Sequence, residues 1–172
     1  MDTKYIMSIV FIFVAILGFS QSIALTEGGD YLENGQEVVF IGDHTLADMA
    51  IDLAVTNTSS GTKEISCVRY ELDSIPASAL YMCWANCTVL PSGGTVSLGP
   101  GETSDLFSAH VNPNNHYGIE RSLYTFFDEN NPNDSMSFIA TFTTTSFLLK
   151  DEEDHVLIYS EKELWGAVNG II

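Results

Sequence analysis

Positive charge is scarce in this chain of 172 residues. Six Lys and Arg residues stand against 23 Asp and Glu residues, which gives a formal net charge of −17 at pH 7. Phosphate binding needs a basic surface, so this composition excludes a nucleic-acid partner, and the same repulsion disfavours an anionic membrane surface. Charged residues make up 17% and hydrophobic residues 45%. This balance allows a buried core and excludes extensive disorder.

Catalytic signatures are also absent. The sequence has no Gly-x-Ser-x-Gly elbow and no glycine-rich phosphate loop, and Gly93-Gly94 fits an ordinary turn. Cys83 or Cys87 could act as a nucleophile with His110, but an oxidising compartment favours a disulfide. Acids are too numerous for any two to stand out as a glycosidase pair. These absences predict a protein that is not an enzyme.

The sequence lacks an apolar run long enough for an ordinary membrane span. Its longest run, residues 6–19, follows Lys4 and precedes Ser20, whereas a spanning helix needs roughly 20 apolar residues. A basic residue, a short apolar run and then small residues are typical of a signal peptide. We therefore expect residues 1–24 to be a signal peptide, with cleavage after Ser20 or after Ala24. The alternative is an uncleaved anchor.

Export follows from this reading. The mature chain would reach the periplasm, the cell surface or the medium, and would touch the membrane only transiently through its leader. No Cys lies near the expected cut, so a lipid anchor on cysteine is not available.

Short segments with strand character fill most of the remaining sequence. Residues 25–36, rich in Gly, are expected to be a flexible lead-in, and residues 37–145 are expected to form one domain. Seven or eight strands bounded by Gly, Pro, Asn or Asp predict an all-β antiparallel sandwich, although a closed barrel would give similar spacing. The expected strands are 37–41, 51–57, 64–72, 80–84, 95–98, 106–110, 119–127 and 135–143.

The acidic tail, residues 146–172, differs from the rest. Residues 151–154 are four consecutive acids, with apolar residues 147–149 before them and 156–159 after them. A hairpin with an acidic turn fits this pattern. Residues 160–165 could instead begin a short helix, because Ser160 can cap it with Glu163 three positions later. The tail is too short to fold alone.

Three cysteines leave the disulfide connectivity open. Cys67 and Cys83 are equally far from a turn near Ile75, which would place them opposite each other on neighbouring strands. A Cys83–Cys87 bridge would need a tight turn, because an extended strand would separate their Cα atoms by roughly 13 Å. Cys67–Cys87 is the third possibility. We expect one bridge and one remaining thiol, with Trp84 packed nearby.

A family resemblance rests on several short strings in a particular order. They are Cys67-Val-Arg, Tyr81-Met-Cys83-Trp84-Ala-Asn-Cys87, Leu98-Gly-Pro-Gly-Glu and residues 124–135. Together they resemble Bacteroidetes secreted proteins that carry one immunoglobulin-like domain, often ahead of a type IX secretion sorting domain. The resemblance covers roughly residues 51–143. It implies an exported, non-catalytic, immunoglobulin-like sandwich with a structural, adhesive or ligand-binding role; the sorting domain itself is not evident in the tail.

Residues 128–134 contain several Asp and Asn side chains whose oxygens could bind a metal ion, and they suggest an alternative function. Asp128, Asn130, Asn133 and Asp134 could supply some of the six to eight oxygens that calcium takes, although the EF-hand glycine is missing. The simpler interpretation is a turn in which Asn and Asp cap their own backbone. The alternative to a binding module is therefore an exported metal-binding protein, with calcium at residues 128–134 as the first candidate.

Histidines offer a weaker metal hypothesis. His110 and His116 lie six residues apart with Asp105 upstream, and such a pair in a β-sandwich can bind copper or zinc. The compact Cys–His–Met loop of cupredoxins is missing. Two solvated loop histidines are therefore the favoured interpretation.

Two further surface features point to modification or recognition. Asp73-Ser74-Ile75 and Asp134-Ser135-Met136 resemble the Asp-Ser/Thr-aliphatic sites that Bacteroidetes O-glycosylate, and both are expected in turns. Tyr81, Tyr117 and Trp165 could stack on sugars, although aromatic residues in strands are more often core. The partner is accordingly left as an unidentified protein or glycan.

Overall fold

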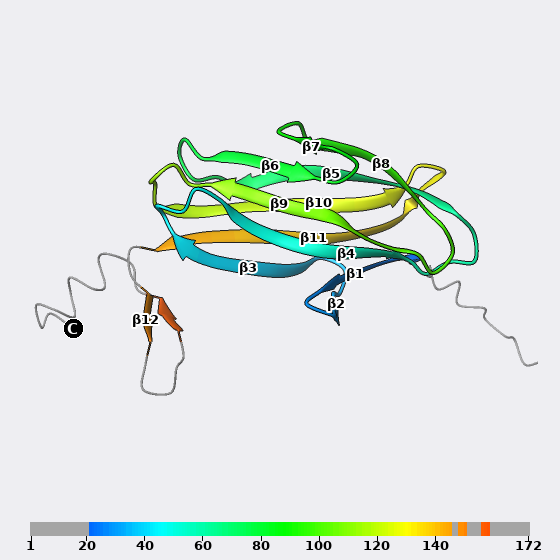
Figure 1. Ribbon diagram of the computed structural model, residues 1–172, viewed down its shortest axis with the longest axis horizontal. Coiled ribbons are helices and arrows are strands. Elements are labelled where there is room, and N and C mark those ends of the chain that lie inside the picture. Colours follow the sequence, from blue (N-terminus) through cyan, green and yellow to red (C-terminus); the bar gives the residue numbers. More distant parts are fainter. Residues whose placement is uncertain (1–20, 146–147, 151–155, 159–172) are drawn as a thin grey trace, which may run out of the picture.

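Two stacked β-sheets form the body of the protein (Figure 1). The computed structural model describes residues 21–145, 148–150 and 156–158. The six-stranded sheet has the order β2 (Asp30–Tyr31), β1 (Ile23–Glu27), β4 (Met49–Asn57), β9 (Thr103–Asn112), β6 (Ala79–Cys83) and β7 (Cys87–Thr88). The five-stranded sheet has the order β3 (Gln36–Asp43), β11 (Asn131–Thr145), β10 (Gly118–Asp128), β5 (Lys63–Asp73) and β8 (Ser92–Leu98).

The strand order confirms the predicted all-β, immunoglobulin-like sandwich. β1, β4, β9 and β6 occupy the places of strands A, B, E and D of that fold, and β5, β10 and β11 those of C, F and G. One pairing departs from the antiparallel prediction, since β3 runs parallel to β11. A parallel pair requires a long connection, and most of the domain lies between these two strands. The described part of the chain contains no helix that could cross a membrane.

All eight expected strands are present, and three more were missed. β2 and β7 have two residues each, too short for a visible alternation. The lead-in expected at residues 25–36 is corrected: Leu25 is fully buried in β1, which pairs with β4. The glycines of this stretch instead serve a turn, because Gly28 and Gly29, between β1 and β2, have φ values of 59° and 98°.

The core lies between the sheets and follows the period-two pattern of the strands. Met49, Ile51, Leu53 and Val55 point inward from β4. Phe107 on β9 packs edge-on against three rings of the opposite sheet, with centroid distances of 5.2, 5.0 and 5.6 Å to Tyr124, Phe126 and Phe138. Such aromatic contacts between the two sheets hold them in one arrangement.

The tail contributes a separate two-stranded sheet. β12 (Leu148–Lys150) pairs antiparallel with β13 (Val156–Ile158), which agrees with the hairpin interpretation. The four acids at 151–154 and the helix start at 160–165 lie outside the described residues, as do residues 1–20 of the expected signal peptide.

Candidate functional site

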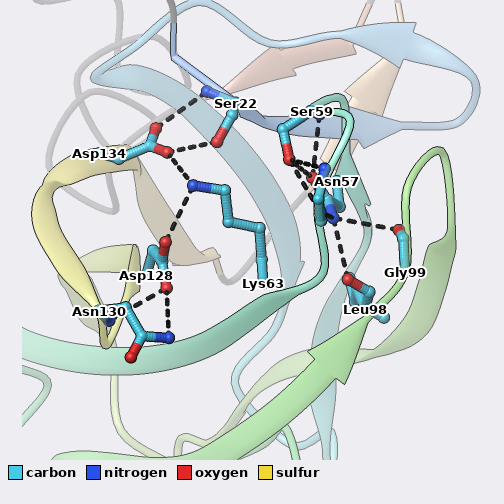
Figure 2. A network of polar contacts seen from close by, with 10 residues as sticks. Ser22, Asn57, Ser59, Lys63, Leu98, Gly99, Asp128, Asn130 and Asp134 are labelled. Carbon is cyan, nitrogen blue, oxygen red and sulfur yellow. Dashed lines mark hydrogen bonds and ion pairs between the residues drawn. The ribbon is translucent and has the colours of Figure 1, made fainter.

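Two of the four expected calcium ligands, Asp128 and Asp134, meet around a lysine (Figure 2). Lys63, the first residue of β5, places its Nζ 2.9 Å from Oδ2 of Asp128 and 2.8 Å from Oδ2 of Asp134. Both carboxylates are nearly inaccessible, with 6% and 9% of their side chains exposed. The turn expected at 128–134 is present but shorter: β10 ends at Asp128 and β11 begins at Asn131, so only Glu129 and Asn130 lie between the strands.

The ammonium group controls the titration of these acids. Burial by itself would raise the pKa of Asp128, but hydrogen bonds from Lys63 and Asn130 outweigh it and hold the pKa below its ordinary value. The pKa of Asp134 is lowered in the same way, because Lys63 and Ser22 donate to it against the effect of burial. Hydrogen bonds to the two carboxylates raise the pKa of Lys63. The three groups are therefore charged together at neutral pH.

A calcium ion at this place would have to displace the Lys63 ammonium. Asn130 is already engaged with Asp128, to which its main-chain N–H donates at 3.1 Å, and Asn133 is exposed on β11. Among the described residues, no group of three or more His, Cys, Asp or Glu side chains is placed to hold a metal ion. The structure thus brings Asp128 and Asp134 together as counter-ions of a lysine.

Asp134 also fastens the beginning of the described chain to β11. Its carboxylate accepts hydrogen bonds from the main-chain N–H of Ser22, at 2.9 Å, and from the Ser22 hydroxyl. Ser22 lies directly before β1, and Gln21 donates to the main-chain oxygen of Ser135 at 3.1 Å. Sequence reasoning missed this clamp because its partners are more than a hundred residues apart.

A second polar network near this clamp is built on Asn57 (Figure 2). Its amide Nδ2 lies 2.8, 2.9 and 3.1 Å from the carbonyl oxygens of Gly61, Leu98 and Gly99. Its Oδ1 accepts from the main chain and hydroxyl of Ser59. Asn57 is fully buried, so the network satisfies a side chain that would otherwise be costly to bury. The only sequence signal was an Asn at the end of a strand.

The two candidate metal-binding histidines have different surroundings. Nδ1 of His110 lies 3.0 Å from Oδ2 of Asp48, and its Nε2 lies 2.8 Å from Oγ of Ser108. The His110 ring stacks on Tyr81 at 4.3 Å and 4°. His116 contributes its main-chain oxygen to the hydroxyl of Thr144. Burial, followed by the Asp48 carboxylate, raises the pKa of Tyr81.

The remaining candidate aromatics are less informative. The Tyr117 ring lies tilted against His44, with centroids 4.1 Å apart and an interplanar angle of 35°, and Trp165 lies outside the described residues. Asp105 is exposed on β9. The sequence alone did not indicate that Asp48 and Ser108 would contact His110, because neither residue lies in a nucleophile-elbow motif or at the spacing of metal ligands.

The cysteines form the local bridge that needed a tight turn. Cys83 and Cys87 are register partners in β6 and β7, with Cα atoms 3.9 Å apart, and they form a disulfide. Cys67 is a free thiol on β5 in the other sheet. Burial raises the pKa of the Cys67 thiol well above its ordinary value, so it is chemically quiet. Cys67 and Cys83 are therefore not neighbours across a hairpin.

The two glycosylation candidates differ in accessibility. Ser74 is exposed between β5 and β6, as expected for a turn. Ser135 was expected in a turn but lies within β11, paired with Phe127, and is half-buried. The pairing of β11 with β10 explains the difference, because it includes Ser135 in the strand.

One face of the molecule combines low charge with exposed apolar side chains. On the outer face of the five-stranded sheet, Tyr70, Leu123 and Ile139 form one row across β5, β10 and β11. Tyr70 is 70% exposed, whereas Leu123 and Ile139 are half-buried. Other large apolar residues exposed on this face are Val39, Val68 and Ile119. The charges near the row pair with one another, since Arg121 lies 3.3 Å from Glu37 and 3.2 Å from Asp73.

Comparison with known proteins yields structural likeness only. No known protein family and no curated protein matches the sequence. Among solved structures, the N-terminal domain of PorA is similar with a TM-score of 0.60 and 18% identity, over 71% of this chain and 96% of that one. The chain shares the fold of that domain. A PapD-like domain of human CEP192 matches with a TM-score of 0.44 and 8% identity, over 86% of this chain and 98% of that one.

Proposed function

We propose that this chain is an exported, non-catalytic binding module that presents the outer face of its five-stranded sheet to a partner protein. The observation that carries the proposal is the row of Tyr70, Leu123 and Ile139 on that face. Exposed aromatic and aliphatic side chains with few charges are characteristic of the centre of protein–protein interfaces. The role is recognition at the cell envelope or outside the cell.

The charge distribution favours a partner surface that is apolar and weakly charged. The whole chain carries a net charge of −17, yet Arg121 is matched on this face by Glu37 and Asp73. Charged groups that already pair with each other lose less on desolvation than isolated ones. A glycan would instead require many hydrogen-bonding groups beside an exposed ring. Tyr81, which the sequence suggested as a sugar-stacking residue, already stacks on His110. A protein partner therefore fits better than a glycan.

Export is supported by two independent features. The leader expected at residues 1–24 directs the chain out of the cytoplasm. The Cys83–Cys87 disulfide is of the kind that persists in oxidising compartments. The calcium alternative gains no support, because Lys63 supplies the positive charge between Asp128 and Asp134.

A binding assay with matched variants tests the proposal. Labelled, purified protein is incubated with the envelope fraction of the cells that produce it, and the bound amount is measured against protein concentration. Tyr70→Ser removes the most exposed aromatic side chain of the proposed face. Leu106→Ser is the control, because Leu106 is 58% exposed on β9 of the other sheet.

We expect Tyr70→Ser to weaken binding at least about tenfold, which is the size expected for an interfacial aromatic anchor. Leu106→Ser should bind like the unchanged protein. Equal affinities for Tyr70→Ser and the unchanged protein, or a loss confined to Leu106→Ser, would contradict the proposal.

A further inference from the structure

Three side chains on the outer face of the six-stranded sheet form a hydrogen-bonded chain that the binding role does not use. The carboxylate of Asp48 lies 3.0 Å from Nδ1 of His110, and Nε2 of His110 lies 2.8 Å from Oγ of Ser108. An acid, an imidazole and a hydroxyl in this order are the constellation that activates serine in unrelated hydrolases. We infer that Ser108 is a nucleophile that accepts an acyl group from an uncharged ester.

The acid fixes which nitrogen of His110 carries the proton. An ionised carboxylate only accepts hydrogen bonds, so Asp48 requires a proton on Nδ1. In the neutral imidazole, Nε2 is then an acceptor and receives the Ser108 hydroxyl proton. Tyr81 stacks on the ring at 4.3 Å and 4° and holds its plane. Asp48 and Tyr81 are positioning residues, because they act through His110.

The strand geometry places the reacting groups on one accessible surface. Ser108 and His110 lie two residues apart on β9, so both side chains point to the outer face. Ser108 is half-buried and therefore reachable from solvent. Its register partner on β4 is Asp52, which is exposed. The negative charge of Asp52 disfavours anionic esters and favours an uncharged acyl donor.

The chemical step balances without any additional reactant. The Ser108 oxygen attacks the ester carbonyl carbon while its proton moves to Nε2 of His110. The C–O bond to the alcohol then breaks, and the alcohol leaves with that proton. The products are acyl-Ser108, one free alcohol and neutral His110.

Acylation is expected to occur once per chain, without rapid turnover. β9 is flanked by β4 on one side and β6 on the other, so the main-chain N–H groups of this strand belong to the sheet ladder. They are not directed at an oxyanion, whose stabilisation is usually the largest contribution to acyl-transfer catalysis. The acylated protein should therefore accumulate, which is compatible with a non-catalytic module.

The test uses the purified chain and p-nitrophenyl acetate as the probe. Release of p-nitrophenol is followed by absorbance, the number of acetyl groups by intact mass, and their position by peptide mapping. We expect a burst of one p-nitrophenol per chain and one acetyl group on Ser108. Ser137, a half-buried surface serine hydrogen-bonded to Thr125 at 2.9 Å, is the internal control and should stay unlabelled.

Variants separate activation from structure. Ser108→Ala should abolish the burst, and His110→Gln should slow it at least about 100-fold, the size of a general-base contribution. Asp48→Asn should also slow it, and Asp48→Glu should restore part of the rate, which a merely structural role would not produce. Thermal unfolding of each variant verifies the fold. Equal acetylation of Ser137, an unchanged rate in His110→Gln, or a burst that survives in Ser108→Ala would overturn the inference.

Discussion

The indole nitrogen of Trp84 donates a hydrogen bond of 2.9 Å to the main-chain oxygen of Ile65, from one sheet to the other. Trp84 follows β6 directly, and its ring meets Phe126 edge-on at 5.3 Å. Gly93 permits this position, because a Cβ there would lie only 2.9 Å from the Cβ of Trp84. Since Trp84 lies between Cys83 and Cys87, the disulfide fixes the turn that delivers this side chain to the core.

The disulfide should therefore stabilise the fold measurably. Replacing both cysteines, Cys83→Ser with Cys87→Ser, should lower the free energy of unfolding by about 2 kcal/mol, the loop-entropy value for so short a loop. Denaturant unfolding of the variant and the unchanged protein measures it. In the unchanged protein, Cys67 should react with a thiol reagent only after denaturation. A stability change below about 0.5 kcal/mol, the usual range for surface substitutions, would contradict this role.

The ion pairs of Lys63 with Asp128 and Asp134 should contribute more to the free energy of unfolding than a surface ion pair does. Lys63→Met leaves Asp128 and Asp134 buried without a counter-ion, so we expect a loss of about 3 kcal/mol in the free energy of unfolding. Arg121→Met is the matched control, because its two ion pairs are exposed to solvent and should contribute much less to stability. Equal losses in the two variants would contradict this role of Lys63, and so would a rise in the Tm of the unchanged protein with millimolar calcium.

The ion pairs of Lys63 also predict that the stability of the fold decreases at acidic pH. The pKa values of Asp128 and Asp134 are lowered in the folded state. Their contribution to the free energy of unfolding is therefore present above the unfolded-state pKa, near 4, and is lost as the pH falls through their folded-state pKa values. The stability difference between the unchanged protein and Lys63→Met should shrink below about pH 4. A difference that stays constant with pH would exclude this linkage.

Glu120 predicts the opposite pH dependence. Its side chain is buried on β10, where Oε2 accepts from the N–H of Ile75 and the hydroxyl of Ser78, while Oε1 has no hydrogen-bond partner among the described residues. Burial raises the pKa of Glu120, so its protonated form favours folding and that contribution is lost as the pH rises above the unfolded value near 4.3. Glu120→Gln should be about 1 kcal/mol more stable than the unchanged protein at pH 7 and nearly equal to it at pH 4. Denaturant unfolding of both proteins at pH 4 and pH 7 measures the difference. A Glu120→Gln variant that is less stable than the unchanged protein at pH 7 would contradict this prediction.

The start of β1 distinguishes the two expected cleavage positions. A cut after Ala24 would remove Ile23 from the core and Ser22 from its contact with Asp134. A cut after Ser20 keeps both, so we expect the mature chain to begin at Gln21. Intact mass of the protein recovered from the envelope or medium measures this directly. A mature chain that begins at Leu25 would show that this end of β1 is dispensable.

Local residue patterns explain what the sequence could predict. The stretch around Ile51 alternates apolar and polar residues, and residues 119–127 are aromatic and β-branched in character; the structure confirms strands at both places. Local patterns could not reveal β3 running parallel to β11, because that pairing depends on the whole intervening chain. They also could not reveal that Asp128 and Asp134 pair with a lysine, because Lys63 comes from β5. The Asp48–His110 contact joins two separate segments in the same way.

Photo-crosslinking from two matched positions tests the central claim, that the outer face of the five-stranded sheet binds a protein. A benzophenone amino acid replaces Tyr70 in one variant and Leu106 in another, and each protein is irradiated in the envelope of the producing cells. The account predicts a discrete adduct from position 70 and none from position 106. Adducts of equal yield at both positions, or an adduct from position 106 alone, would contradict it, as would an absence of adducts at position 70.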